Sequence, residues 1–454
     1  MRDTNRVETV AQEAAVLVGV LLADRNQQGP LLEELEGLTA AAGARVVGQL
    51  TQRRLAPDAA TYLGRGKVEE LKTLIRSRNA DVVVFDNDLG AAQIRNLEKS
   101  LGVKVVDRTE LILDIFASRA RTYEARLAVE LAQLEYSMPR LKRMWTHLSR
   151  QKKGIGLRGP GEKQLEVDRR LVERRVADLR SELNAIHRRK EREVAARGAS
   201  MTVSLVGYTN AGKSTLMNAL TGADVYTEDA LFATLDTRTR RWTLPGWGPV
   251  LLSDTVGFIR DLPHHLIASF KATLEEARQA DLLLHVADAS NEGVYEQISA
   301  TYRVLEEIGI EAKNTLLVIN KIDALDSRAR LDGLLSRYPN AVPISAQTGF
   351  GLSNLAAAVS DALSRAFVEV DVETGVDNGR LMAYLAAQGE ILSKQYHDSR
   401  VTVHCRLPQH FLSRIDGQGT VVRIPGRNGD HRADLEDRDG TLDWEADSWK
   451  AQGT

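Results

Sequence analysis

The sequence contains little of what stabilises secreted proteins or anchors proteins in membranes. Cys405 is the only cysteine, so no disulfide can form within the chain, and we expect a reducing cytoplasm as its location. No apolar run approaches the roughly 20 residues that cross a bilayer, which predicts that the chain has no membrane span. The first residues, MRDTNRVETVAQEA, are polar and carry both signs of charge, so they do not resemble a secretory signal.

The chain also lacks a strong net charge, but its charges are unevenly distributed. The total is −2, whereas residues 138 to 197 hold 18 Lys or Arg against 8 Asp or Glu. Residues 430 to 447 hold eight acids and two arginines. This asymmetry predicts that the basic segment faces a polyanion. A solvated helix of mixed charge is the alternative there, and a solvated tail is the simpler interpretation of the acidic stretch.

The length of 454 residues exceeds what one core supports and favours about three domains. Strand-like and helix-like stretches alternate from residue 16 to residue 118, which is typical of βαβ units around a parallel sheet. The expected strands are residues 16–22, 44–50, 81–85 and 103–107. The expected helices are residues 31–42, 67–78 and 91–102.

A different pattern follows, in which leucines and other apolar residues recur at alternating spacings of four and three. One stripe runs from Leu127 to Leu148, and a second runs from Val172 to Ile186. Two such stripes predict an antiparallel helical hairpin. The joining loop is expected at 152–166, where four glycines and a proline occur, and Pro139 should kink or break the first helix.

Alternation of strands and helices returns from residue 201 to residue 365. The expected strands there are TVSLVG, VLLSD, LLLHVAD, TLLVINK and AVPIS. The last part begins with a strand, FVEVDV, followed by a helix over 379–394 and a strand, VTVHCRL. We therefore expect four domains, with bounds at 1–120, 121–197, 198–367 and 368–454.

The segment GYTNAGKST follows an apolar strand and precedes a helical stretch, which is the setting of a phosphate-binding loop. Backbone N–H groups from Asn210 to Ser214 and the helix N-terminus would wrap the phosphates. Lys213 would reach the β- and γ-phosphates, and the Ser214 hydroxyl would bind Mg²⁺. The expected nucleotide contacts in this loop are Gly207, Tyr208, Thr209, Asn210, Ala211, Gly212, Lys213, Ser214 and Thr215.

Two further segments are expected to surround the γ-phosphate and the metal. Asp254 of DTVG would hold Mg²⁺ through a water, and the Gly257 N–H would sense the γ-phosphate. One threonine of the loop LFATLDTRTR must complete the Mg²⁺ shell; Thr234 is favoured, with Thr237 and Thr239 as alternatives. The expected contacts are Phe232, Ala233, Thr234, Leu235, Asp236, Asp254, Thr255, Val256 and Gly257.

The segments NKID and SAQTG predict guanine as the base. The Asp323 carboxylate can accept hydrogen bonds from guanine N1–H and the 2-amino group, whereas adenine would leave it desolvated and unpaired. Lys321 would lie over the base, Asn320 would tie this loop to the phosphate loop, and the Ala346 N–H would meet guanine O6. The expected contacts are Asn320, Lys321, Ile322, Asp323, Ser345, Ala346 and Gln347.

Together these motifs predict a protein that binds GTP or GDP with Mg²⁺ and hydrolyses GTP. The fold class is α/β: a P-loop GTPase domain with a parallel sheet, preceded by a small parallel α/β domain and an antiparallel helical hairpin, and followed by a small α+β domain. Ras-like enzymes place a glutamine after the DxxG glycine to orient the attacking water. Here Phe258 occupies that position, so no catalytic residue is identified and hydrolysis by the isolated protein should be slow.

The chain resembles the HflX family of translation-factor-related GTPases over about residues 15 to 365. The resemblance rests on GYTNAGKSTLMNALTG, LFATLDTRTRR, DTVGF and above all GIGLRGPGEKQLEVDRR, with YLGRGKVEEL and VELAQLEY. Where the family commonly has Asp-Pro-Thr-Thr-Arg, this chain has Asp236-Thr237-Arg238-Thr239-Arg240. The resemblance implies binding to the large ribosomal subunit, an N-terminal region near the peptidyl-transferase centre, and a role in ribosome splitting, rescue or biogenesis.

The residues themselves indicate only that the hairpin and its loop can meet a phosphate backbone. The loop glycines allow close approach, and Arg158 and Lys163 supply charge. We expect a monomer that contacts rRNA through this region. The alternative is a signalling GTPase with a protein partner and a dimerising hairpin. A metabolic kinase is disfavoured by NKID.

Overall fold

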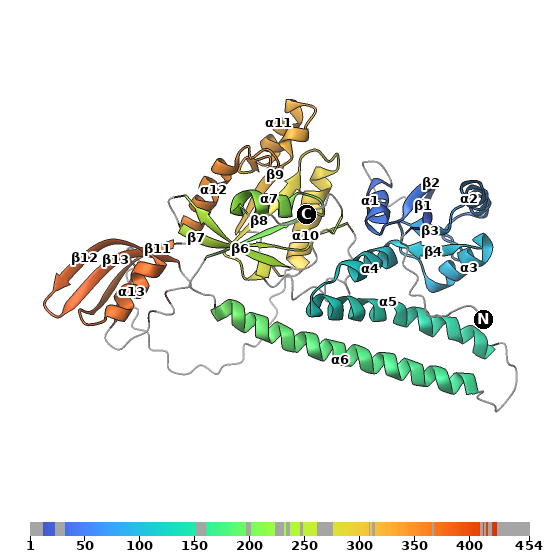
Figure 1. Cartoon of the computed structure of the whole chain (residues 1–454), viewed down its shortest axis with the longest axis horizontal. Helices are drawn as coiled ribbons and strands as arrows, with labels where there is room; N and C mark the ends of the chain where they lie inside the picture. Colours follow the sequence, from blue (N-terminus) through green and yellow to red (C-terminus); the bar gives the residue numbers. More distant parts are fainter. Residues whose placement is uncertain are drawn as a thin grey trace, which may run out of the picture. The chain divides into compact units, whose positions relative to one another are not determined.

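In the computed structural model, the chain divides into two compact units, residues 1–363 and residues 364–454. Figure 1 shows the elements along the chain. The structure describes residues 12–22, 32–150, 160–196, 201–222, 231–232, 237–245, 248–260, 276–307, 309–310, 314–365, 367–408, 412, 415 and 420–424. Among the helices in these ranges, none combines the length and apolar character needed to cross a membrane.

The N-terminal region forms a parallel sheet of four strands in the order β2-β1-β3-β4, as the alternating pattern predicts. Its strands are β1 (Ala14–Leu22), β2 (Arg45–Arg54), β3 (Val82–Phe85) and β4 (Lys104–Asp107). Its helices are α1 (Glu33–Ala41), α2 (Arg65–Arg78), α3 (Ala91–Leu101) and α4 (Arg108–Arg119). Residues of α1 and α4 pack on one face of the sheet and residues of α2 and α3 on the other. Strands covered on both faces are apolar along their length, which explains the run in β1.

The helical hairpin consists of α5 (Tyr123–Arg150) and α6 (Pro160–Ala196), which lie alongside each other in Figure 1. The predicted stripes meet in a buried cluster that includes Leu127, Leu131, Val176, Leu179 and Leu183. The helix α5 runs through Pro139 without a break, and a kink there stays a prediction. The expected bounds of the loop were wrong: residues 160–166 are helical, because Pro160 occupies the first helical position, where its missing N–H costs nothing. The remaining loop, 151–159, lies outside the described residues.

The GTPase domain has a sheet of six strands in the order β10-β9-β8-β5-β7-β6, in which only β6 pairs antiparallel. Its strands are β5 (Thr202–Gly207), β6 (Arg238–Leu244), β7 (Gly248–Asp254), β8 (Leu282–Asp288), β9 (Thr315–Asn320) and β10 (Val342–Pro343). Its helices are α7 (Lys213–Thr221), α10 (Val294–Glu307), η2 (Ile322–Ala324), α11 (Arg328–Arg337) and α12 (Leu352–Ser364). The strand β6 is not among the expected strands, because the sequence predicts a loop up to residue 240.

The described residues of the second unit form an antiparallel sheet in the order β12-β13-β11-β14, which the helix α13 accompanies. Its elements are β11 (Phe367–Gly375), α13 (Gly379–Gln388), β12 (Glu390–His397), β13 (Arg400–Pro408) and β14 (Val421–Arg423). The expected helix over 379–394 was too long. It ends before Gly389, whose backbone approaches β13 so closely that a Cβ would lie 2.4 Å from the Arg406 carbonyl oxygen.

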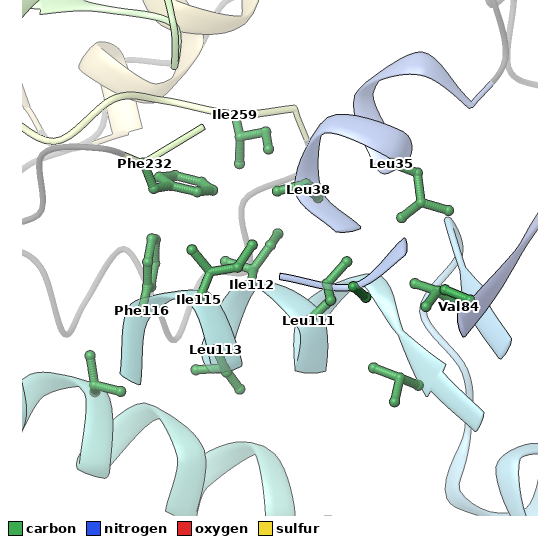
Figure 2. Packing of buried hydrophobic residues seen from close by; sticks show 14 of the residues in the cluster. Leu35, Leu38, Val84, Leu111, Ile112, Leu113, Ile115, Phe116, Phe232 and Ile259 are labelled. Atoms are coloured by element: carbon green, nitrogen blue, oxygen red, sulfur yellow. The ribbon is translucent and has the colours of Figure 1, made fainter. Parts of the chain in front are cut away.

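One buried cluster joins the N-terminal sheet to the GTPase domain within the first unit. It combines residues of α1 and α4 with Tyr208, Phe232, Val256 and Ile259 of the GTPase domain. The rings of Phe116 and Phe232 meet edge to face, with centroids 4.6 Å apart. Figure 2 shows Phe232 and Ile259 facing the side of α4 that carries Ile112, Ile115 and Phe116. Segments flanking the predicted nucleotide site are therefore part of the N-terminal core.

Candidate functional site

The phosphate-loop sequence connects β5 to α7 and requires glycine at two positions. Gly207 has φ +147°, and a Cβ there would lie 2.2 Å from the Val286 carbonyl oxygen. Gly212 has φ +89°, and a Cβ there would lie 2.4 Å from the Asn320 side-chain nitrogen. Both positive angles favour glycine. The loop is thus packed between β8 and the end of β9 with no room for side chains at these positions.

Lys213 and Ser214 begin α7 and face the loop and the end of β7. The buried Lys213 ammonium donates to the Gly207 carbonyl at 3.2 Å and to the Tyr208 carbonyl at 2.9 Å. Burial lowers the pKa of Lys213 to about 8, although the Asp254 charge opposes the shift. The Ser214 hydroxyl donates to Asp254 Oδ2 at 2.6 Å. The structure therefore brings one cation, one hydroxyl and one carboxylate to the same end of the sheet.

The DTVG segment lies directly against the phosphate loop. A Cβ at Gly257 would be 2.8 Å from Thr209 Cα and 3.0 Å from Lys213 Nζ. The Thr209 N–H donates to the Phe258 carbonyl at 2.7 Å, and the Phe258 N–H donates to the Gly207 carbonyl at 3.0 Å. These two backbone bonds fix the position of the segment after Gly257 relative to the loop.

Phe258 follows Gly257, at the position where Ras-like enzymes have a glutamine, and its side chain lies in the core of the GTPase domain. Its side chain is 3% exposed and packs with Val206, Leu283 and Leu305 in the core of the GTPase domain. An apolar ring buried in this way offers no hydrogen-bonding group to a water. The structural role of Phe258 is therefore to anchor the DTVG segment.

The NKID and SAQTG segments are joined to the phosphate loop through Asn320. Its side-chain amide donates to the Ala211 carbonyl at 2.9 Å, and its side-chain oxygen accepts the Ala346 N–H at 3.0 Å. Lys321, with φ +60°, forms an ion pair with Asp288 at 2.9 Å. Asp323 is exposed at the start of η2. Three segments that are distant in the sequence thus meet at one buried amide.

The threonines proposed for the metal are only partly within the described residues. Residues Ala233, Thr234, Leu235 and Asp236 lie outside them. Thr239 belongs to β6, and its hydroxyl lies 3.0 Å from Ser253 Oγ and 3.1 Å from Glu276 Oε2. Thr237 is partly buried and directly precedes that strand. Because Thr239 is engaged in the sheet, it is a weaker candidate than a threonine of the preceding loop.

Comparisons with known proteins cover most of the chain. Family models described as "GTP-binding GTPase N-terminal", "GTP-binding GTPase Middle Region" and "50S ribosome-binding GTPase" match residues 30–117, 119–197 and 202–321. The GTPase HflX of Escherichia coli (strain K12) is 47% identical, with 88% of this chain and 94% of that protein covered. The GTPase HflX of Caldanaerobacter subterraneus is 42% identical, with 89% and 93% covered.

The chain belongs to the HflX family of GTPases. As a member of the HflX family, it binds GTP and hydrolyses it to GDP and phosphate. Among solved structures, a GTP-binding protein from Sulfolobus solfataricus in complex with GDP is 25% identical. That match covers 78% of this chain and 99% of the archaeal chain, with a TM-score of 0.42.

The sequence reasoning missed a set of charged residues beside the site of this HflX GTPase. Tyr208, expected only as part of the phosphate loop, directs its hydroxyl toward Glu34 of α1. Arg108, Asp86 and Arg260 surround the same contact. Arg260 stands only three residues after Gly257, which could have drawn attention to it. No motif marks Glu34 or Asp86.

We expect the GTP affinity of this HflX GTPase to fall as pH rises through about 8. Below that pH the Lys213 ammonium is charged, as the predicted phosphate contact requires, whereas above it that contact would require uptake of a proton. The dissociation constant should then rise by up to about tenfold per pH unit. Calorimetry at pH 8.5 in two buffers of different ionisation enthalpy measures the proton uptake. Lys213→Arg should abolish that uptake; an unchanged uptake would assign the proton to another group.

Proposed function

We propose that the four motif segments hold GTP in the manner that the sequence predicts. Backbone N–H groups from Asn210 to Ser214 surround the phosphates, Lys213 neutralises them, and Asp323 selects guanine. The observation that supports this best is the Asn320 amide, which joins Ala211 of the phosphate loop to Ala346. A nucleotide that contacts all three segments at once binds more tightly when their geometry is already fixed, because little rearrangement then accompanies binding.

Mg²⁺ fits the oxygen groups at the start of α7. Ser214 and Thr234 would bind the ion directly, and Asp254 would hold it through a water. Hydroxyl and carboxylate oxygens are the ligands that Mg²⁺ prefers, and Ser214 Oγ lies 2.6 Å from Asp254 Oδ2. When bound, the ion would neutralise charge on the β- and γ-phosphates.

The attacking water needs a positioning group that the residue after Gly257 does not supply. Because Phe258 is buried in the core, hydrolysis by the isolated protein should be slow. A partner that orders the site would accelerate the reaction. We propose that this partner is the large ribosomal subunit, and that the protein acts in the cytoplasm in ribosome splitting, rescue or biogenesis.

The charge on α6 supports this partner. Its exposed side carries Arg170, Arg174, Arg188 and Arg192, while Arg175 and Arg180 form ion pairs with Glu130 and Glu135 of α5. Exposed arginines along a helix suit a phosphate backbone. The family model that matches residues 202–321 is described as a 50S ribosome-binding GTPase, which favours the same partner. The dimerising-hairpin alternative is disfavoured, since the described apolar stripes of α5 and α6 bury each other.

Adding large ribosomal subunits should raise the rate of phosphate release from GTP. Replacing Arg174 and Arg188 together with glutamine should lower the stimulated rate, leave the basal rate unchanged and reduce the salt dependence of subunit binding. The matched control replaces Arg175 and Arg180, which removes the same charge from arginines already paired within the hairpin. Steady-state phosphate release and co-sedimentation are the measurements. A rate that subunits do not change would instead favour a protein partner.

A further inference from the structure

Tyr208 connects the phosphate loop to the N-terminal sheet domain through its hydroxyl. The side chain is buried, and the hydroxyl donates to Glu34 Oε1 at 2.5 Å. The same oxygen accepts the backbone N–H of Arg260 at 2.7 Å. One hydroxyl therefore holds three segments together: the phosphate loop, the stretch that follows Gly257, and the first turn of α1.

Buried charges fix Glu34 in place. Arg108, at the start of α4, contacts Glu34 at 3.0 Å and Asp86 at 2.8 Å. Its guanidinium also donates to the Arg260 carbonyl at 3.1 Å. The Arg260 side chain reaches Asp86 at 3.1 Å. Since Arg108 is almost fully buried, these groups have little freedom to exchange partners for water.

The stretch from Val256 to Arg260 is held on both sides. Phe258 points into the GTPase core, while Val256 and Ile259 point into the cluster shared with α1 and α4. Between them, Gly257 lies against Thr209 and Lys213 with no space for a side chain. Any contact that fixes residues 258–260 therefore also fixes the Gly257 N–H.

We propose that Tyr208 is a positioning residue for GTP recognition, which uses Glu34 and the Arg260 N–H to hold Gly257 against the phosphate loop. The inference rests on the proposed role of Gly257 at the γ-phosphate. Because GDP has no γ-phosphate, the contact favours the triphosphate over the diphosphate. Coupling of this kind is reciprocal, so bound GTP strengthens the docking of the N-terminal sheet on the GTPase domain.

The test compares the affinities of the full-length protein for GDP and for a non-hydrolysable GTP analogue, both with Mg²⁺, by calorimetry without ribosomes. Tyr208→Phe should weaken binding of the analogue by about fivefold or more, at the lower end of typical coupling effects, and leave GDP binding nearly unchanged. The matched control is Tyr136→Phe, which removes a similar tyrosine–carboxylate bond, in this case between α5 and the buried Asp107 at the end of β4. The control should lower stability without altering the ratio of the two affinities.

Two further variants make the outcome decisive. Glu34→Gln should shift the affinity ratio in the same direction, and its effect should not add to that of Tyr208→Phe, because both act on one contact. Gly257→Ala tests the underlying role of Gly257. If Gly257→Ala changes the ratio and Tyr208→Phe does not, the positioning role of Tyr208 is wrong. If neither changes it, the proposed γ-phosphate contact fails as well. Equal losses for GDP and the analogue in Tyr208→Phe would overturn the inference too.

Discussion

Replacing Asp323 with asparagine is expected to convert the guanine site of this HflX GTPase into a xanthine site. In the proposed site the Asp323 carboxylate would accept two hydrogen bonds from guanine, whereas an asparagine amide can donate to the C2 carbonyl of xanthine. Sites that hydrogen-bond a substrate group reject analogues that lack it by about 10⁴-fold, so the preference between GTP and xanthosine triphosphate should change on that order. Asp323 is exposed, so the fold should tolerate the substitution.

The affinities of both nucleotides for both proteins provide the measurement. Asp326→Asn is the matched control, since Asp326 is an exposed carboxylate three residues further along the same segment. The control should bind GTP like the wild type. Equal GTP affinity in wild type and Asp323→Asn would show that another group confers the specificity for guanine.

Replacing Arg108 with alanine is expected to be among the most destabilising single substitutions in the first unit. The side chain is 4% exposed and faces Glu34 and Asp86. Removing one partner of a buried ion pair typically costs about 3–5 kcal/mol, because the remaining charge stays buried without compensation. Burial already raises the pKa of Asp86, and Arg108 opposes that shift. Without Arg108 the carboxyl should take up a proton more readily, so the destabilisation should shrink as pH is lowered.

Urea denaturation at pH 7.5 and at pH 5 measures both effects. Arg260→Ala is the control. The Arg260 guanidinium contacts the same two carboxylates but is 34% exposed, so this substitution should lower the free energy of unfolding by less than about 1 kcal/mol. If Arg108→Ala lowers the free energy of unfolding no more than the control does, water must enter the cluster. A decrease in the free energy of unfolding that became larger toward low pH would contradict the assigned charges.

Short segments of sequence were sufficient to predict the nucleotide motifs and most of the strands. Gly207, Gly212 and Lys213 occupy a strand–loop–helix unit whose geometry depends on neighbours in the chain, so their spacing alone indicates the loop. The parallel sheet of the N-terminal region was predicted from its apolar runs, such as that of β1. Strands are apolar along their whole length when helices cover both faces of the sheet. The family resemblance rested on the same local segments and is confirmed by the HflX relatives.

Errors arose where distant contacts overrode the local pattern. The expected helix over 379–394 gives way to β12, because Gly389 meets β13 and the following residues pair with that strand. Likewise β6 forms because it pairs along its whole length with β7, although its sequence, RTRRWTL, is rich in arginine and does not suggest a buried strand. In both cases hydrogen bonds to another strand decided the conformation.

By itself, the sequence determined that this protein binds a guanine nucleotide. Each motif is a short run of neighbouring residues, so its chemistry can be inferred without knowledge of distant contacts. Only the tertiary structure decided what the site is attached to. Glu34 and Tyr208 are 174 positions apart, and Asp86 and Arg260 are also 174 positions apart. No spacing rule relates such residues. They meet because α1 and α4 share one apolar core with Phe232 and Ile259, and once that core excludes water, the charges at its edge must pair with one another.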